Sequence, residues 1–228
     1  MFGHGPLFGD IVDLIRATGG RLKSVIQNIP EEVRAGTKPL ARLIDEQERR
    51  WPDELRIDVA PLENFQPVAG EKCVIGFRGH RLTPLRNHLR VRFGLTFPAL
   101  IHPTAIISPT AEVGEGTIVG AGAIVGSGVR LGRFALLNRG CTVGHDCSLE
   151  DFANVGPGAN LASFVTLRQS ATVGIGATII NFLEVGAHSV VGAGAVVTKD
   201  VPEHTLVAGV PATPKKLLNL EPGLEQLD

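Results

Sequence analysis

The hydrophobic pattern of the chain changes character near residue 99. From Ile101 to Val197 an aliphatic residue stands at every sixth position without exception, seventeen times in succession. These residues are Ile101, Ile107, Val113, Val119, Val125, Leu131, Leu137, Val143, Leu149, Val155, Leu161, Leu167, Val173, Ile179, Val185, Val191 and Val197. An α-helix has a period of about 3.6 residues and an alternating strand has a period of two, so neither produces this repeat.

A second register, two positions before each aliphatic residue, is occupied almost throughout by small residues such as Ala123, Cys141 and Ala177. Both registers fit short strands and tight turns that wind into a triangular coil, with three repeats in each turn and the aliphatic side chains inside. Glycine often follows the aliphatic residue, as at Gly126, and we expect it there because it tolerates the unusual φ and ψ of a turn. The repeat predicts a left-handed parallel β-helix of between five and six coils.

Residues 1–98 follow a different pattern. The apolar spacing predicts helices at residues 8–17, from 37 onward and at 83–94, and strands at 22–27 and 73–77. Alternating strands and helices predict a small Rossmann-like α/β domain with a parallel sheet, whose first strand is short or missing. The expected organisation is therefore an α/β domain (1–98), a β-helix (99–206) and a C-terminal tail (207–228).

Composition narrows the class of protein. A net charge of −1 gives no global field for nucleic acid or an anionic membrane. No apolar run approaches the roughly 20 residues that span a bilayer, and we find no signal peptide. The cysteines Cys73, Cys141 and Cys147 form no paired motif, which favours free thiols in a reducing cytoplasm.

Several segments resemble the bacterial sialic-acid O-acetyltransferase and nucleotide-aminosugar N-acetyltransferase family of hexapeptide-repeat acyltransferases. They are Leu136–Asp146, Ala153–Ala159, Val191–Pro202 and Val207–Ala212, with a looser match at Gly3-His4-Gly5 and Gly76. The resemblance implies a homotrimer, acetyl-CoA as co-substrate and a nucleotide-sugar-binding N-terminal domain. It places the catalytic histidine at His145, with Asp146 as its acidic neighbour.

The resemblance also places acyl-CoA contacts near Leu167, Ile175, Ala193 and Gly194. Asn154 stands where many relatives carry a second histidine near the CoA, and an amide can hydrogen-bond there but cannot act as a base. For the acceptor we name Gly3, His4 and Gly5, since a Gly-rich turn before a helix can bind phosphate through backbone N–H groups. We add Arg78, as a cation for a nucleotide diphosphate, and Asn181.

The chemistry of acyl transfer suits these residues. A histidine, whose usual pKa is about 6.5, can take the proton from a sugar amine or hydroxyl as a general base. A carboxylate can fix its tautomer, but neighbouring side chains of a strand point in opposite directions, so a His145–Asp146 contact requires a corner of the coil. A covalent acyl-cysteine route is disfavoured, because Cys141 and Cys147 occupy the inward register.

Residues that lie three repeats apart stack in columns, which brings His145 into line with Ser163, Asn181 and Lys199. The adjacent column holds Asp146, Phe164, Phe182 and Asp200. The polar column could line an acceptor or pantetheine groove. The phenylalanines either stack as part of the coil or a subunit interface, the interpretation that we favour, or form an apolar wall for the pantetheine arm.

Two other functions compete with an acyltransferase. A non-catalytic or degenerate scaffold is consistent with Asn154, with Gln27-Asn28 in place of acidic base-reading residues, and with the short first strand. A γ-class carbonic anhydrase needs three histidines on zinc, but His102, His145, His188 and His204 share no column, so we expect no metal. The acceptor sugar, and transfer to nitrogen or oxygen, stay open.

Overall fold

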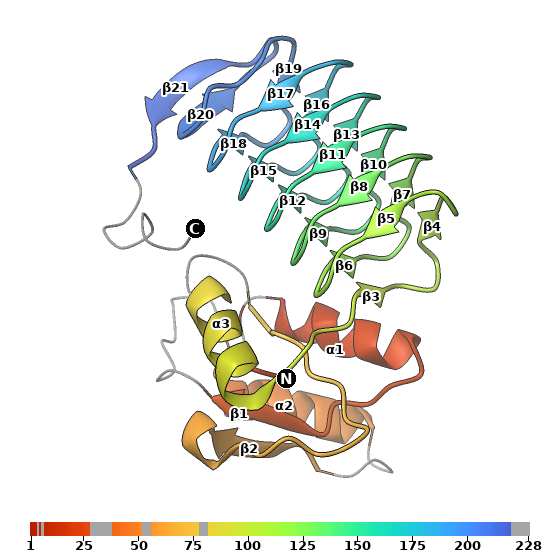
Figure 1. The fold of residues 1–228 in the computed structure, drawn as a ribbon, viewed down its shortest axis with the longest axis vertical. Helices are drawn as coiled ribbons and strands as arrows, with labels where there is room; N and C mark the ends of the chain where they lie inside the picture. The colour runs from red at the N-terminus through yellow and green to blue at the C-terminus, as the bar shows by residue number, and fades with distance from the viewer. Residues whose placement is uncertain (4, 6, 28–37, 52–55, 78–81, 220–228) are drawn as a thin grey trace. The chain divides into compact units, whose positions relative to one another are not determined.

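The computed structural model describes residues 1–219, apart from residues 4, 6, 28–37, 52–55 and 78–81. Contacts divide the chain into two compact units, Met1–Pro98 and Ala99–Gln226. The first is an α/β unit and the second is a parallel β-solenoid of about six turns, as the sequence predicts (Figure 1).

The α/β unit contains a short parallel sheet. Its elements are α1 (Phe8–Ala17), β1 (Ser24–Gln27), α2 (Leu40–Arg50), β2 (Asp58–Pro61), the 3-10 helix η1 (Leu62–Asn64) and α3 (Leu82–Phe93). β1 pairs in parallel with β2, a strand that the sequence pattern did not predict. Phe2 forms parallel bridges to both Ile26 and Ile75. The first strand is therefore present but is reduced to a single bridging residue.

The core of this unit follows from its amphipathic helices. α1 buries Phe8, Ile11, Val12 and Leu14 on one face. Phe2, at the centre of the sheet, is 1% exposed and lies edge-on to Phe65, with ring centroids 4.8 Å apart. The bridging residue that replaces a first strand is therefore also a central core residue.

The solenoid consists of very short strands separated by turns. They are β3 (Leu100–Ile101), β4 (Ile106–Ile107), β5 (Glu112–Val113), β6 (Ile118–Val119), β7 (Ile124–Val125), β8 (Arg130–Leu131), β9 (Leu136–Leu137), β10 (Thr142–Val143), β11 (Ser148–Leu149), β12 (Asn154–Val155), β13 (Asn160–Leu161), β14 (Thr166–Leu167), β15 (Thr172–Val173), β16 (Thr178–Ile179), β17 (Glu184–Val185), β18 (Val190–Val191) and β19 (Val196–Val197). Each strand pairs in parallel with the strand three repeats away, as Val143 does with Val125 and Leu161.

These pairings build three sheets, which are the three faces of the prism. One contains β4, β7, β10, β13, β16 and β19; the second contains β5, β8, β11, β14 and β17; the third runs from β3 through β6, β9, β12, β15 and β18. The aliphatic register fills the interior: Leu137, Leu167 and Val185 are fully buried, and only the first three members are partly exposed. Removing these apolar side chains from water is the main force that holds the coils together.

The structure corrects our explanation of the glycines. Positive φ occurs at the third position after the aliphatic residue, as at Gly122 and Gly128, and not at the glycine that follows it directly. At that following position a Cβ on Gly126 or Gly144 would lie 2.7–2.8 Å from the backbone of the next coil. Those glycines are therefore required by the close stacking of coils rather than by backbone conformation.

The last coil departs from the period of six. β20 (Thr205–Ala208) pairs with β18 in a register that sets Val207 opposite Val191, so this coil is shorter than those before it. β21 (Thr213–Leu217) pairs antiparallel to β20, and the segment expected to be a tail thus contains two strands.

The shorter coil also takes Asp200 out of its predicted column. Oδ1 of Asp200 accepts a hydrogen bond from the backbone N–H of Glu184, on the neighbouring sheet, rather than continuing the column of Phe182. Our assignment of Asp200 to the column of Phe182 was wrong, whereas that of Lys199 stays a prediction.

Candidate active site on the solenoid

Three edges separate the three sheets, and each edge has a column of residues with positive φ. The glycine edge carries Gly122, Gly140, Gly158, Gly176 and Gly194; the His145 edge carries Gly128, Asp146, Phe164 and Phe182; the Phe152 edge carries Gly116, Phe134, Phe152, Ser170 and His188. The backbone is closely similar at all three, so the side chains alone make the edges chemically different.

His145 and Asp146 are in contact at their edge. Nδ1 of His145 lies 2.8 Å from Oδ2 of Asp146, and about half of each side chain is exposed. The contact exists because Asp146 has a φ of 57°, which turns its side chain back toward its neighbour. From the sequence we expected this contact to form only at a corner of the coil, and the structure has a corner here. Because a half-exposed ion pair contributes little to folding stability, we expect this contact to affect mainly the chemistry of the imidazole.

The hydrogen bond defines what the imidazole can do. An ionised carboxylate only accepts hydrogen bonds, so a neutral His145 must donate its Nδ1–H to Asp146. Nε2 then carries the free lone pair on an exposed side chain. This arrangement can accept a proton from a bound nucleophile, and the carboxylate can stabilise the imidazolium that results.

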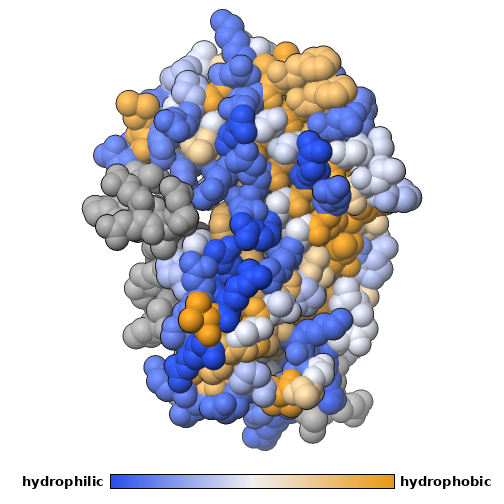
Figure 2. All heavy atoms as spheres, in the orientation of Figure 1, coloured by the Kyte–Doolittle hydropathy of each residue, from blue (hydrophilic) through white to orange (hydrophobic). Residues whose placement is uncertain are grey.

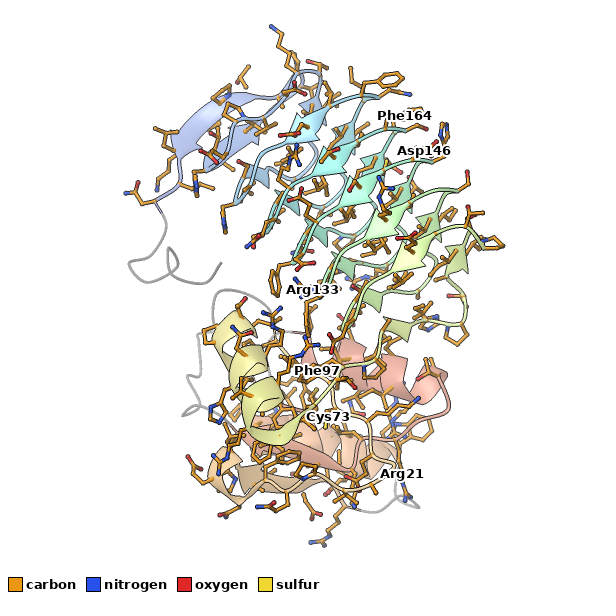
Figure 3. All side chains as sticks on the ribbon, viewed as in Figure 1. Arg21, Cys73, Phe97, Arg133, Asp146 and Phe164 are labelled. Atoms are coloured by element: carbon orange, nitrogen blue, oxygen red, sulfur yellow. The ribbon has the colours of Figure 1, made fainter. Side chains whose placement is uncertain are left out.

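The predicted column above His145 forms. The backbone N–H of Phe164 donates to the carbonyl oxygen of His145, at 3.1 Å, and that of Phe182 donates to the carbonyl oxygen of Ser163, at 3.2 Å. Asn181 is exposed two coils beyond His145. Figure 3 shows Asp146 and Phe164 at the same edge on successive coils. The edge therefore presents an imidazole, a hydroxyl and an amide in one line.

Aromatic rings lie beside this polar column. Phe164 meets His145 edge-on, with ring centroids 5.2 Å apart, and stacks on Phe182 at 4.9 Å with an interplanar angle of 10°. Phe182 is 72% exposed. Phe134 and Phe152 stack similarly on the Phe152 edge, at 5.9 Å. Beyond them His188 stacks on His204, so our expectation that these two histidines share no column was wrong. The stacking of Phe164 on Phe182 agrees with the column predicted from the sequence, and the Phe152 edge shows the same kind of stacking.

The residues assigned to acyl-CoA lie elsewhere on the solenoid. Ile175, which is 63% exposed, Ala193 and Gly194 gather on the glycine edge, where a Cβ at Gly194 would meet nothing within 4 Å. Asn154 lies on β12, on the sheet that leads to that edge. Leu167 is fully buried inside the solenoid, so its side chain cannot touch a ligand on the surface, and we withdraw it from the site.

The residues assigned to the nucleotide fall in the α/β unit. Gly3 has a φ of 63°, and its backbone N–H donates to the carbonyl oxygen of Ile26 at 2.7 Å. The carbonyl oxygen of Gly5 accepts a bond from the backbone N–H of Phe8 at the start of α1, at 2.9 Å. The turn therefore joins the bridging Phe2 to a helix, as predicted. His4 and Arg78 lie outside the described residues.

The cysteines are not positioned for covalent catalysis. Cys141 and Cys147 lie in the buried small register, and burial raises the pKa of the Cys141 thiol to about 12. Burial also raises the pKa of Cys147, whose Sγ lies 3.0 Å from the carbonyl oxygen of Ala162. A thiol with a raised pKa supplies little thiolate, which is the nucleophilic form.

The sequence analysis missed a charged ladder on the β5–β17 sheet, over which hydrophilic side chains gather in Figure 2. Arg168 bonds to Glu150 at 2.8 Å and to Glu184 at 2.6 Å, beside a depression of about 730 Å³ that Asp200 and Glu203 also line. The available signal was the placement of opposite charges about one coil apart in the sequence. These groups satisfy one another, so the ladder is structural.

No metal site or membrane-spanning helix is found in the part of the chain that the structure describes. Among those residues, no group of three His, Cys, Asp or Glu side chains could hold a metal ion. The three zinc-binding histidines of a γ-class carbonic anhydrase are therefore not found among the described residues. None of the described helices has the length and apolar character to cross a membrane.

Known structures resemble the whole chain. A histidine-to-asparagine variant of perosamine N-acetyltransferase from Caulobacter crescentus, in complex with CoA and GDP-perosamine, has 27% sequence identity and a TM-score of 0.73, over 94% of this chain and 95% of that one. The acetyltransferase domain of PglB from Neisseria gonorrhoeae FA1090, in complex with acetyl coenzyme A, has 26% identity and a TM-score of 0.70, over 94% and 97%.

A third structure, WeeI from Acinetobacter baumannii AYE, matches over 94% of this chain and 97% of that one, with a TM-score of 0.76; its 23% identity shows the fold alone. No protein-family model and no curated protein sequence matches the chain. The predicted resemblance to the hexapeptide-repeat sugar acetyltransferases is confirmed by the structural comparisons.

Proposed function

We propose that this chain, as one of the hexapeptide-repeat sugar acetyltransferases, transfers an acetyl group from acetyl-CoA to an amine or hydroxyl of a nucleotide-linked sugar. Two similar structures, of perosamine N-acetyltransferase and the PglB domain, contain CoA or acetyl-CoA, and the first also contains GDP-perosamine. The observation that carries the proposal is the exposed His145–Asp146 pair on a solenoid of this type.

In this mechanism Nε2 of His145 accepts the proton of the acceptor as its nitrogen or oxygen attacks the thioester carbonyl. The tetrahedral intermediate then collapses, the C–S bond breaks, and the CoA thiolate takes a proton, which the imidazolium can supply. Asp146 holds the tautomer and offsets the charge of the imidazolium. Ser163 and Asn181, in the same column, would bind the acceptor or the pantetheine arm.

The two groups of candidate residues lie on different edges of one chain. His145 belongs to one edge, whereas Ile175, Ala193 and Gly194 belong to the glycine edge, and the sheet from β4 to β19 separates them. We propose a homotrimer in which the His145 edge of one protomer faces the glycine edge of the next, so that acyl-CoA lies between them. Asn154, on the sheet beside the glycine edge, would then hydrogen-bond CoA.

For the acceptor we propose the Gly3-His4-Gly5 turn and Arg78 as phosphate-binding groups of the α/β unit. Because the backbone N–H of Gly3 already donates to Ile26, the N–H groups that follow Gly3 would bind the phosphate. The free cysteines favour a cytoplasmic location, where acetyl-CoA is available. A non-catalytic scaffold is disfavoured, since it needs no histidine fixed by a carboxylate.

The proposal is tested by release of the CoA thiol from acetyl-CoA in the presence of UDP-, GDP- and dTDP-linked 4-amino sugars. We expect stoichiometric thiol release and acetylated product with at least one acceptor, and none with His145→Ala. Saturable CoA binding without thiol release on any of these sugars would contradict the nucleotide-sugar form of the proposal.

A further inference from the structure

We propose that Phe164 and Gly128, from the coils on either side of His145, are positioning residues that fix the orientation and tautomer of its imidazole. The inference rests on the proposed function, in which this ring is the base. It concerns two residues that touch the His145–Asp146 pair and take no part in proton transfer themselves.

Phe164 holds the ring from the following coil. Its ring meets the imidazole edge-on, at a centroid distance of 5.2 Å and an interplanar angle of 85°. That geometry is one of the preferred arrangements of two aromatic rings, so it favours one orientation of the imidazole. Phe164 is itself held by Phe182, which stacks on it at 4.9 Å.

The backbone at Phe164 places its ring at the corner of the coil. Its φ is 59°, in the left-handed region that is unfavourable for a bulky side chain. This conformation is shared by the corner residues of all three edges, such as Phe134 and Phe152, and is imposed by the coil. Glycine would fit this turn position with less strain, as it does at Gly128 in the same column. A phenylalanine here thus adopts a strained backbone that places a ring beside His145.

Gly128 acts on Asp146 from the preceding coil. A Cβ at Gly128 would lie 2.5 Å from Oδ1 of Asp146, so the carboxylate occupies the space that a side chain would fill. The backbone N–H of Asp146 also donates to the carbonyl oxygen of Ser127 at 2.8 Å. The missing side chain at residue 128 therefore lets Oδ1 lie against the preceding coil while Oδ2 bonds His145.

Together the two contacts set both properties that a base needs. The bond from Nδ1–H to Asp146 selects the tautomer with a free Nε2, and the ring of Phe164 restricts rotation of the imidazole. A misplacement of about 1 Å can cost roughly a hundredfold in rate, so small displacements of either neighbour should be visible in turnover.

Matched variants isolate each contact. Phe164→Leu removes the ring beside His145, and Phe152→Leu makes the same change at a φ of 63° on the Phe152 edge. Gly128→Ala displaces the carboxylate, and Gly94→Ala, in the α/β unit, places an alanine at a similar φ of 63° where a Cβ meets nothing within 4 Å. Phe164→Tyr restores a ring and serves as the conservative rescue.

The decisive readout is the tautomer of His145, from the nitrogen chemical shifts of histidine-labelled protein at pH 8.5, assigned by comparison with His145→Ala. The parent chain, Phe152→Leu, Gly94→Ala and Phe164→Tyr should show the Nδ1–H form. Phe164→Leu and Gly128→Ala should shift toward Nε2–H, and their kcat should fall about ten- to hundredfold with the KM for acetyl-CoA unchanged.

Two results would overturn the proposal. One is the parent tautomer in both Phe164→Leu and Gly128→Ala; the other is a raised KM with an unchanged kcat, which would make Phe164 a wall for substrate. The tautomer measurement needs no substrate, so it distinguishes a failure of this inference from a failure of the proposed reaction. Circular dichroism of each matched pair shows whether the variants fold.

Discussion

The His145 edge and the glycine edge share a backbone conformation, but their side chains differ in chemistry. Over residues 122–194 both place a residue with positive φ at each corner, with φ between 57° and 66°. At the glycine edge this residue is always glycine, and the corner is open. At the His145 edge it becomes aspartate and then phenylalanine twice, which builds a carboxylate and an aromatic stack beside an imidazole.

The difference shows how a repetitive fold acquires a site. The interior register and the close-stacked glycines set the geometry of every coil, so corners with the same backbone can carry different side chains. A few side chains at one edge can then supply reactive groups on the scaffold, whereas an edge of glycines leaves room for a ligand to approach the backbone.

The largest expected effect is on kcat, and it distinguishes His145 from His188 at the Phe152 edge. His145→Ala should lower kcat about a thousandfold, because general base catalysis contributes roughly 10²- to 10⁴-fold. His188→Ala, at the Phe152 edge, should leave kcat within about twofold. Steady-state thiol release measures both, and equal losses in the two variants would remove the distinction between the edges.

A second prediction concerns the interior that the edges share. Leu149→Ala should lower the free energy of unfolding by about 2–5 kcal/mol, since it leaves a cavity among fully buried side chains. Ile106→Ala, where the side chain is 64% exposed, should change it by no more than about 0.5 kcal/mol. Urea unfolding followed by circular dichroism gives both values. Similar losses would argue against an interior of stacked aliphatic residues.

A third prediction tests the carboxylate at the His145 edge. Asp146→Asn should lower kcat about a hundredfold with little change in stability. An amide can donate to Nδ1 and so favour the wrong tautomer, while a half-exposed ion pair contributes only about 0–1 kcal/mol to folding. Kinetics and thermal melting are measured on the same preparation. A variant with lower thermal stability and a normal kcat would show that Asp146 has a structural role rather than a catalytic one.

The smallest expected effect is on the cysteines. At pH 8 Cys141 and Cys147 should resist a thiol-specific disulfide reagent in the folded protein, because burial raises the pKa of Cys141 to about 12 and raises that of Cys147. Only Cys73, which is half-buried, should react, and slowly, because burial raises its pKa too. All three should react in denaturant. Fast reaction of two or more thiols in the folded state would contradict the packing.

The sequence predicted the solenoid because the period of six is a direct consequence of how its side chains alternate between the interior and the corners. It also predicted that a His145–Asp146 contact requires a corner. It could not predict the role of each glycine, because the distance between stacked coils depends on backbone geometry that composition does not encode.

Other features escaped prediction for similar reasons. The short last coil, which removes Asp200 from its column, changes the spacing only after Val197, where the repeat has ended. Leu167 was assigned to CoA through resemblance, although its own register placed it inside. β2 has the exposed sequence Asp58–Pro61, with little apolar pattern to reveal a strand.

The central claim is that the His145 edge is where the thioester reacts. A crystal structure of the complex with CoA tests it most directly. We predict that the CoA sulfur lies within about 4 Å of Nε2 of His145, close to the near-attack separation of reacting groups. The pantetheine arm should run toward the glycine edge of a neighbouring protomer. A CoA sulfur bound at the Phe152 edge, or at any place out of reach of His145, would contradict the account.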